Sequence, residues 1–291
     1  MEHVVMMPGW LEPPDLPGID YVFWDDGEPL PPDAMLARVT TYVPPYLAPN
    51  PEVMARLPAL TQVQALMAGV DDLAPRVPPG VTLRRAAGLH DTSTAELAVG
   101  LMIASLRGID VAARDMVEAR WRHERRPALA DRTVGVVGWG GVGQAVARRL
   151  SGFEVTVVGF SRSGSAGSLT MGELDRHLGD LDVVVLCVPL DATSRHLLDA
   201  TRLAALPDGA LVVNVGRGGL IDTEALVDEL QSGRLRAALD VTDPEPPPPD
   251  HPLWRCPGLL ITPHVGGDSE AFVPRARALV ARQMRELVGQ S

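Results

Sequence analysis

The stretch Gly138-Trp139-Gly140-Gly141-Val142-Gly143 decides the fold class of the chain. The apolar run Thr133-Val134-Gly135-Val136-Val137 precedes it, and Gln144-Ala145-Val146-Ala147-Arg148-Arg149-Leu150 follows it. The first flank predicts a buried strand and the second a helix, which is the context in which GxGxxG indicates a dinucleotide-binding turn. The alternative is a tight turn that holds no ligand, but strand, glycines and helix all lie in register. We therefore predict that the chain binds a dinucleotide.

Each glycine of this turn has its own expected role. Gly138 permits the tight turn, Gly140 lets a pyrophosphate approach the backbone, and Gly143 lets the helix pack close to the strand. The N-terminus of the helix then offers unpaired N–H groups and a partial positive charge to the phosphates.

The end of the next strand bears on which dinucleotide is bound. The strand expected over Phe153–Phe160 is followed by Ser161-Arg162-Ser163. An acidic side chain about 20 residues beyond the turn would bind the ribose hydroxyls of NAD. A hydroxyl beside a guanidinium instead suits a 2′-phosphate, because it adds a charge-assisted donor and removes a like-charge clash. We predict that NADP(H) is preferred and NAD(H) possible; the alternative is that Arg162 stacks on the adenine and both cofactors are accepted.

Length and composition limit the remaining possibilities. With 291 residues and 46% hydrophobic residues, the chain is expected to form two domains with packed cores. A net charge of −11 argues against nucleic acid and anionic membrane surfaces as partners. The apolar stretch Leu97–Leu106 is too short to span a bilayer, and the N-terminus does not resemble a signal peptide. Cys187 and Cys256 form no CxxC pair, so we expect reduced thiols in a cytoplasmic protein.

The absence of lysine excludes whole chemistries. All 26 basic residues are arginine. Schiff-base chemistry, a Walker A site and a lysine general acid are therefore impossible. This excludes the 3-hydroxyacid dehydrogenases related to 6-phosphogluconate dehydrogenase, which use GxGxxG but depend on a lysine.

The chain before the glycine turn predicts a small α/β unit with a parallel sheet. Its expected strands are Val4–Met7, Tyr21–Trp24, Val39–Val43, Leu60–Leu66 and Thr82–Arg84. Ser93 and Glu96 have the spacing of a capping box that opens a helix over Ala95–Arg107. This helix and the next, expected over Ile109–Trp121, are apolar around much of their circumference. Such helices need a second covering surface, through domain packing or a homodimer.

Strand signals recur after the turn, with helical stretches between most of them, as a doubly wound sheet requires. They lie at Val155–Val158, Val183–Val188, Leu211–Val215, Ala237–Val241 and Leu259–Ile261, before a final helix expected over Ser269–Val288.

Three polar side chains follow three successive late strands, and their types fit one reaction. In parallel sheets, ligands bind beyond the carboxyl ends of the strands, so these side chains should converge. Arg217 can hold a 2-oxo acid through its carboxylate and ketone. His264 can deliver a proton to the ketone oxygen. Glu245 behind the imidazole would raise the pKa of His264 and fix its tautomer.

The second half of the chain resembles the D-isomer-specific 2-hydroxyacid dehydrogenase family, which includes glyoxylate/hydroxypyruvate reductases and D-glycerate and phosphoglycerate dehydrogenases. Motifs that carry the resemblance occur in the family's order from about residue 57 onward: Cys187–Leu190 with Thr193–Asp199, Asn214–Asp222, Ala238–Pro246 and Thr262–Gly267. Upstream, Met67-Ala68-Gly69-Val70-Asp71 resembles the family's loop whose backbone N–H groups hold the substrate carboxylate. Thr242 and Asp243 replace the more usual Phe and Glu, and the first 55 residues match only loosely.

The resemblance implies an α/β fold with two Rossmann-like domains. A doubly wound dinucleotide-binding domain at 94–267 would be inserted in a smaller flavodoxin-like substrate domain of 1–93 and 268–291. Arg217, Glu245 and His264 would be catalytic, with Ala68, Gly69, Val70, Arg217 and His264 contacting the substrate. Asp240 would contact the nicotinamide carboxamide, and Asp71 could alternatively cap a helix. The expected cofactor contacts are Gly138, Gly140, Gly141, Val142, Gly143, Ser161, Arg162, Ser163, Val188, Pro189, Val215, Asp240 and Gly266.

The function that follows is the NADPH-dependent reduction of a small 2-oxo acid to the D-2-hydroxy acid, by a homodimer and without a metal. One alternative is a cofactor-gated binding protein similar to the corepressors that resemble this family. Another is a phosphite- or formate-type dehydrogenase, which the short substrate domain and the Ser161-Arg162 pair fit poorly.

Overall fold

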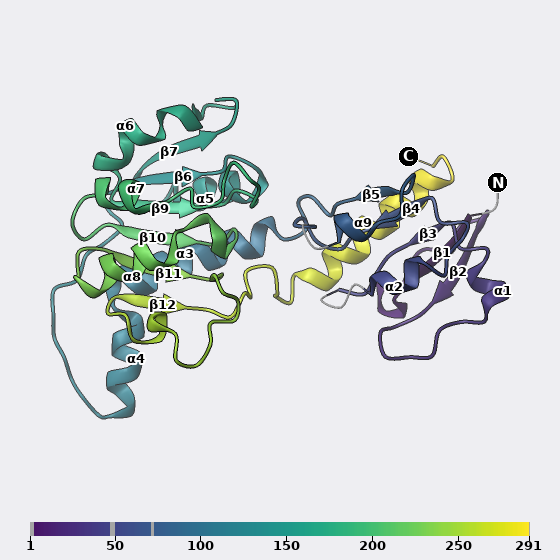
Figure 1. Ribbon diagram of the computed structural model, residues 1–291, viewed down its shortest axis with the longest axis horizontal. Helices are drawn as coiled ribbons and strands as arrows, with labels where there is room; N and C mark the ends of the chain where they lie inside the picture. The colour runs from purple at the N-terminus through teal and green to yellow at the C-terminus, as the bar shows by residue number, and fades with distance from the viewer. Residues whose placement is uncertain (1–2, 47–49, 71–72, 291) are drawn as a thin grey trace. The chain divides into compact units, whose positions relative to one another are not determined.

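The computed structural model describes residues 3–46, 50–70 and 73–290, and it divides the chain into two compact units (Figure 1). One unit comprises Met1–His90 together with Ser269–Ser291, and the other comprises Asp91–Asp268. The second is thus inserted between two segments of the first. Within the described ranges, no helix has the length and apolar character that crossing a bilayer requires.

The smaller unit is built on a parallel sheet whose described strands run in the order β2-β1-β3-β4-β5. This is the flavodoxin-like order. Its strands are β1 (His3–Met7), β2 (Ile19–Phe23), β3 (Thr41–Tyr42), β4 (Gln62–Gln64) and β5 (Thr82–Arg84), and its helices include α1 (Asp33–Leu36), α2 (Pro51–Met54) and α9 (Phe272–Leu287). Alternate residues of β1 enter two cores: Val4 and Met6 pack with α1 and α2, whereas Val5 and Met7 pack with α9. The last helix of the chain therefore covers one face of the sheet that contains the first strand.

The larger unit is a doubly wound sheet whose described strands are all parallel. Its strands are β6 (Thr133–Val137), β7 (Thr156–Ser161), β8 (Leu169–Thr170), β9 (Val183–Leu186), β10 (Leu211–Asn214), β11 (Arg236–Leu239) and β12 (Leu259–Ile261). They lie in the order β12-β11-β10-β9-β6-β7-β8, so the strand order reverses between β6 and β9. That point is where an open α/β sheet binds its ligand.

Helices cover both faces of this sheet (Figure 1). They are α3 (Asp91–Arg107), α5 (Gly141–Leu150), α6 (Leu174–His177), α7 (Ala200–Ala205) and α8 (Thr223–Gln231), whereas α4 (Ile109–Val117) follows α3 and contributes to neither core. Val183 and Val185 pack with α3 and α5, whereas Val184 and Leu186 pack with α6, α7 and α8. Because consecutive strand residues face opposite sides, a strand buried on both faces must be apolar throughout, which explains the Val183-Val184-Val185-Leu186 run.

The prediction that Ser93 caps a helix was wrong. Helix α3 begins at Asp91, so Ser93 lies inside its first turn and is not the cap of a helix that starts at Ala95. Asp91, Thr92 and Ser93 are all good capping residues, and the Ser93–Glu96 spacing pointed to the wrong one.

The helix expected over Ile109–Trp121 ends at Val117. Ala119 adopts a left-handed conformation with φ of 51°, and the N–H of Arg120 donates to the carbonyl of Asp115 at 2.9 Å. This is the geometry with which helices commonly end, usually at a glycine. Because this position holds an alanine and not a glycine, the sequence does not predict where the helix ends.

Candidate active site

The glycine turn between β6 and α5 has the backbone shape that a dinucleotide site needs. Gly138 has φ of +108°, and a Cβ there would lie 2.7–2.8 Å from the backbone of Cys187 and Val188 after β9. A Cβ on Gly143 would lie 1.9 Å from the carbonyl oxygen of Gly138. The space beside Gly140, by contrast, is open to 4 Å. The residues present therefore fit a pyrophosphate held against the turn and the N-terminus of α5, next to Gly141 and Val142.

Trp139, which lies between the first two glycines of the turn, connects the turn to β7 and to the loop after it. Its indole packs over Gly159 so closely that a Cβ on Gly159 would lie 2.2 Å from the ring, and its Nε1 donates to the carbonyl of Ala166 at 2.9 Å. Sequence reasoning gave Trp139 no role. The contact between Gly159 and Trp139 could have been predicted in part from the sequence, because a glycine within a strand often marks a place where another group packs closely against the backbone.

The loop after β7 presents Arg162 to solvent. The hydroxyl of Ser161 contacts that of Ser168 at 2.7 Å and accepts from the N–H of Gly164 at 3.0 Å, which closes the loop on itself. The side chain of Arg162 is 85% exposed and its Nη2 donates to the carboxylate of Asp191 at 3.3 Å. Ser163, the third predicted residue, contacts Ser165 at 3.0 Å. Asp191, which the sequence did not single out, is thus the present partner of the guanidinium expected to meet a 2′-phosphate.

Arg217, Glu245 and His264 follow β10, β11 and β12, which are neighbours in the sheet. The buried Asn214 at the end of β10 shapes the first of these loops: its amide donates to the carbonyl of Arg217 at 2.8 Å and accepts from the N–H of Gly216 at 3.0 Å. The charge of Arg217 acts on both other side chains, lowering the pKa of each. The three predicted residues therefore lie together.

Two of them are joined by a 2.5 Å hydrogen bond between Nδ1 of His264 and Oε1 of Glu245. This bond, with the negative charges of Glu245 and Asp240, raises the pKa of His264 against the opposing effects of burial and Arg217. Burial works to raise the pKa of Glu245, but the hydrogen bond and charge of His264, the N–H of Thr242 and the charge of Arg217 hold it below its ordinary value. The pair thus favours an imidazolium beside a carboxylate, with Nε2 left to face a substrate.

His264 is held in an uncommon backbone conformation, with φ of 53°. Its N–H donates to the carbonyl of Asp240 at 2.8 Å. The carboxylate of Asp240, in a residue only 2% exposed, accepts from Thr262 Oγ1 at 2.6 Å and from the N–H groups of Val265 and Gly266 at 2.9 and 2.8 Å. Residues other than glycine keep a left-handed conformation only where several surrounding contacts hold them in it, and such residues are common at functional sites. Asp240 is thus a positioning residue for the histidine loop; its expected contact with a nicotinamide carboxamide stays a prediction.

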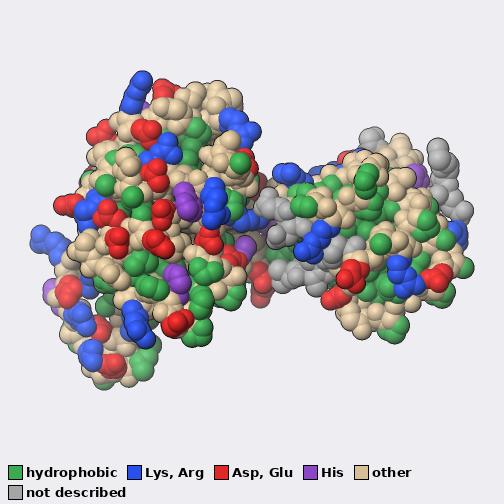
Figure 2. Space-filling view, viewed as in Figure 1, with side chains coloured by type: hydrophobic (Ala, Val, Ile, Leu, Met, Phe, Trp, Pro, Cys, Tyr) green, Lys and Arg blue, Asp and Glu red, His purple; other side chains and the backbone are tan. Residues whose placement is uncertain are grey.

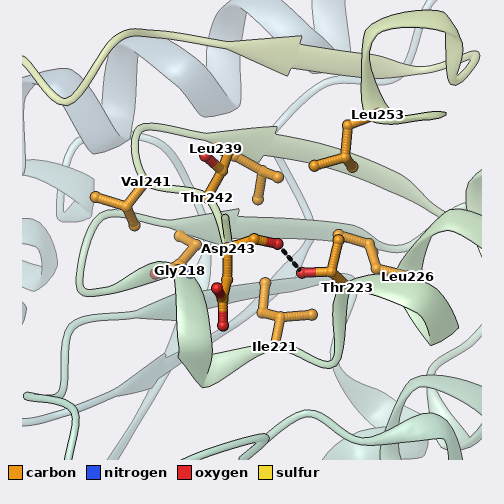
Figure 3. Close-up of a pocket in the computed structure, with 10 residues that line it drawn as sticks. Gly218, Ile221, Thr223, Leu226, Leu239, Val241, Thr242, Asp243 and Leu253 are labelled. Carbon is orange, nitrogen blue, oxygen red and sulfur yellow. Dashed lines mark hydrogen bonds between the residues drawn. The ribbon is translucent and has the colours of Figure 1, made fainter. Parts of the chain in front are cut away.

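The segment after β10 and the segment after β11, which carry Arg217 and Glu245, are packed against each other at Gly218, Thr242 and Asp243 (Figure 3). A Cβ on Gly218 would lie 1.8 Å from the carbonyl oxygen of Thr242. Close by, the hydroxyl of Thr223 donates to the carbonyl of Asp243 at 2.8 Å, the dashed line in Figure 3. Sequence reasoning named Gly218 only as part of a motif, whereas the structure gives it a packing function.

The remaining predicted residues lie at strand ends as well. Val188 and Pro189 follow β9, and the buried Val215 follows β10. In the smaller unit, Ala68, Gly69 and the buried Val70 follow β4, and the carbonyl of Met67 accepts from Ala86 at 3.0 Å. The possible cap Asp71 lies outside the described residues.

Comparison with known protein families gives a match over residues 99–266 to the family described as D-isomer specific 2-hydroxyacid dehydrogenase, NAD binding domain. The chain is 30% identical to a glyoxylate reductase of Thermofilum pendens over 267 residues, covering 87% of this chain and 77% of that protein. It is 32% identical to a D-3-phosphoglycerate dehydrogenase of Methanocaldococcus jannaschii over 231 residues, covering 76% of this chain. The chain spans only 44% of the length of that second relative.

Among solved structures, a D-isomer specific 2-hydroxyacid dehydrogenase from Xanthobacter autotrophicus Py2, in complex with NADPH and MES, resembles the whole chain. The TM-score is 0.79 at 29% sequence identity, and the match covers 100% of this chain and 96% of the other. The two-unit architecture is therefore shared along the entire length.

Proposed function

The chain belongs to the D-isomer-specific 2-hydroxyacid dehydrogenase family, and from that premise we propose that it reduces a small 2-oxo acid of the glyoxylate or hydroxypyruvate type to the D-2-hydroxy acid, with NADPH as the preferred cofactor. The observation that carries the proposal is the His264–Glu245 hydrogen bond of 2.5 Å beside the charge of Arg217. We assign the Asp91–Asp268 unit to the dinucleotide and the other unit to the substrate, whose carboxylate the backbone of Ala68–Val70 would help to hold.

The proposed mechanism gives each side chain one task. Arg217 binds the carboxylate and polarises the ketone of the oxo acid, so the developing negative charge on oxygen meets a guanidinium and needs no metal ion. His264 donates its Nε2 proton to that oxygen. Glu245 holds the ring through Nδ1 and keeps it protonated. When bound, the reduced nicotinamide supplies the hydride that adds to C2, so one hydride and one proton convert the ketone to the hydroxyl.

The direct test is oxidation of NADPH, followed at 340 nm, with glyoxylate, hydroxypyruvate, pyruvate, and branched and aryl 2-oxo acids, repeated with NADH. We expect turnover that is faster with NADPH, and the best acid defines the substrate pocket. Tight binding of NADPH without turnover on any acid would instead favour a cofactor-gated binding protein.

Glu245→Gln is expected to move the alkaline limb of the pH profile of kcat/KM for reduction to lower pH. The carboxylate raises the pKa of His264, so its removal lowers that pKa and the proton is lost at a lower pH. Turnover at neutral pH should also fall, by about 10-fold or more. An unchanged limb would show that another group sets it; Glu224→Gln, on the exposed side of α8, is the matched control.

Arg162→Ala is expected to weaken NADPH binding by about 10-fold while sparing NADH, since it removes one charge-assisted hydrogen bond to the 2′-phosphate. Asp191→Asn should act in the opposite direction: it removes the charge that now pairs with Arg162 and keeps an oxygen for the N–H groups of Thr193 and Ser194. The measurement is the dissociation constant of NADPH and of NADH for each variant. If a variant changes both constants equally, Arg162 does not bind the 2′-phosphate.

We further propose that the protein is a homodimer through α4 and the segment after it. Met116, Val117 and Trp121 are 74%, 83% and 96% exposed, although they are large and apolar. Figure 1 shows α4 extending away from the sheet of its unit, and apolar side chains reach the surface of this extension in Figure 2. Sedimentation equilibrium should give twice the 31.1 kDa chain mass, and Trp121→Glu should shift the distribution toward the monomer.

A further inference from the structure

The loop Ser161–Ser168, which follows β7 and carries Arg162, has a backbone that needs support. Gly164, Ala166 and Gly167 have φ of 66°, 55° and 81°. Glycine adopts many backbone conformations, so a loop with two glycines keeps a single shape only where contacts hold it. Hydrogen bonds among the loop's own serine side chains close the loop on itself. These bonds fix its internal shape, whereas its place beside the glycine turn depends on contacts with other segments.

Trp139 of the glycine turn supplies such contacts. Its Nε1 donates to the carbonyl of Ala166 at 2.9 Å, in the part of the loop where φ is positive. The six-membered ring of its indole covers Gly159 of β7, because a Cβ on Gly159 would lie 2.2–2.5 Å from three atoms of that ring. The ring is half-buried against one core of the larger unit, and the main-chain carbonyl of Trp139 accepts from Gln144 of α5 at 3.1 Å. The indole is therefore a fixed support for the loop.

This one side chain joins the two segments that are expected to bind the two phosphate groups nearest the adenosine. The glycine turn is the expected site of the pyrophosphate, and Arg162 is expected to meet the 2′-phosphate. The side chain of Arg162 is 85% exposed, and its contact with Asp191 at 3.3 Å is an exposed ion pair, of a kind that contributes little to holding a side chain. The backbone of the loop therefore decides where the guanidinium is presented.

We propose that Trp139 is a positioning residue for the choice between NADPH and NADH. By holding the loop Ser161–Ser168 against the glycine turn, the indole keeps Arg162 at the place where the 2′-phosphate arrives. The inference rests on the proposed preference for NADPH, and it assigns part of that preference to a side chain without charge. Because NADH has no 2′-phosphate, its binding does not depend on where the loop presents Arg162.

The test compares the dissociation constants of NADPH and NADH, measured by isothermal titration calorimetry on the full chain. Trp139→Phe keeps a ring over Gly159 but removes the indole N–H, so NADPH binding should weaken by about 5-fold while NADH binding is unchanged. Gly159→Ala, whose methyl group displaces the ring, should have the same selective effect with Trp139 still present. Trp254→Phe is the matched control: it removes an indole N–H that donates to the carbonyl of Pro248 at 2.9 Å, between β11 and β12, and should change neither constant.

A double variant separates positioning from general support of the turn. Arg162→Ala lacks the guanidinium, so adding Trp139→Phe to it should not weaken NADPH binding further. The inference would be overturned if Trp139→Phe weakened both cofactors equally, or if its effect persisted in the Arg162→Ala background.

The unmodified protein shows whether the proposed cofactor preference itself fails. Equal dissociation constants for NADPH and NADH would refute that preference, and the inference with it. A preference for NADPH that Trp139→Phe and Gly159→Ala both leave intact would refute the inference alone.

Discussion

Replacing His264 with alanine is expected to lower turnover by about 10²–10⁴-fold while NADPH affinity stays nearly unchanged, as for the loss of a general acid. The imidazole is the proposed proton donor, and its pKa is raised by Glu245 for that purpose. The glycine turn, by contrast, lies after β6, two strands away from β10 in the sheet order. The measurements are kcat with the best oxo acid and the dissociation constant of NADPH by fluorescence titration.

Two comparisons make the His264 result specific. His123→Ala removes an exposed histidine from the same unit and should leave turnover unchanged. The double variant His264→Ala, Glu245→Gln should be little slower than His264→Ala alone, because Glu245 acts through the imidazole. Loss of NADPH binding together with turnover would contradict the role assigned to His264, since it would point to a disrupted fold or cofactor site.

Much of the architecture could be predicted because it depends on local patterns. The strand Thr133–Val137 was predicted with its observed bounds, since an apolar run flanked by a turn and a helix admits few alternatives. The closeness of Arg217, Glu245 and His264 followed from one rule, that the carboxyl ends of neighbouring parallel strands meet at one edge. What local patterns could not decide were element ends, such as α4 at Val117, where a non-glycine residue takes a left-handed conformation.

The details of the site that the sequence did not yield depend on contacts between segments far apart in the chain. Asp191 is 29 residues from Arg162, and only the folded loops bring the two charges together. Asp240 was expected to face the cofactor, yet its carboxylate accepts three hydrogen bonds from the histidine loop. Such pairings follow from loop geometry, which composition and periodicity do not encode.

Gly218→Ala should lower kcat/KM by about 10²-fold, although the residue has no side chain to offer the reaction. The added Cβ would lie 1.8 Å from the carbonyl oxygen and 2.0 Å from the carbonyl carbon of Thr242, and both are backbone atoms. Ordinary contacts are 3.4–4 Å. The loop of Arg217 and the loop of Glu245 must therefore separate by more than an ångström, a displacement of the size that costs about 100-fold in rate.

The same substitution should leave a folded protein, because overpacking typically costs only about 1–3 kcal/mol. Its effect on activity can then be separated from its effect on stability by measuring kcat/KM and the melting temperature of each variant. Gly152→Ala is the matched control, since no atom lies within 4 Å of its added Cβ. Because Thr242 also donates its N–H to Glu245 at 3.3 Å, moving Thr242 weakens the support of the carboxylate that holds His264. The alkaline limb of the pH profile of kcat/KM should therefore move to lower pH in Gly218→Ala, as in Glu245→Gln. A reduced kcat/KM with an unchanged pH profile would instead show that the substitution displaces Arg217 and not Glu245.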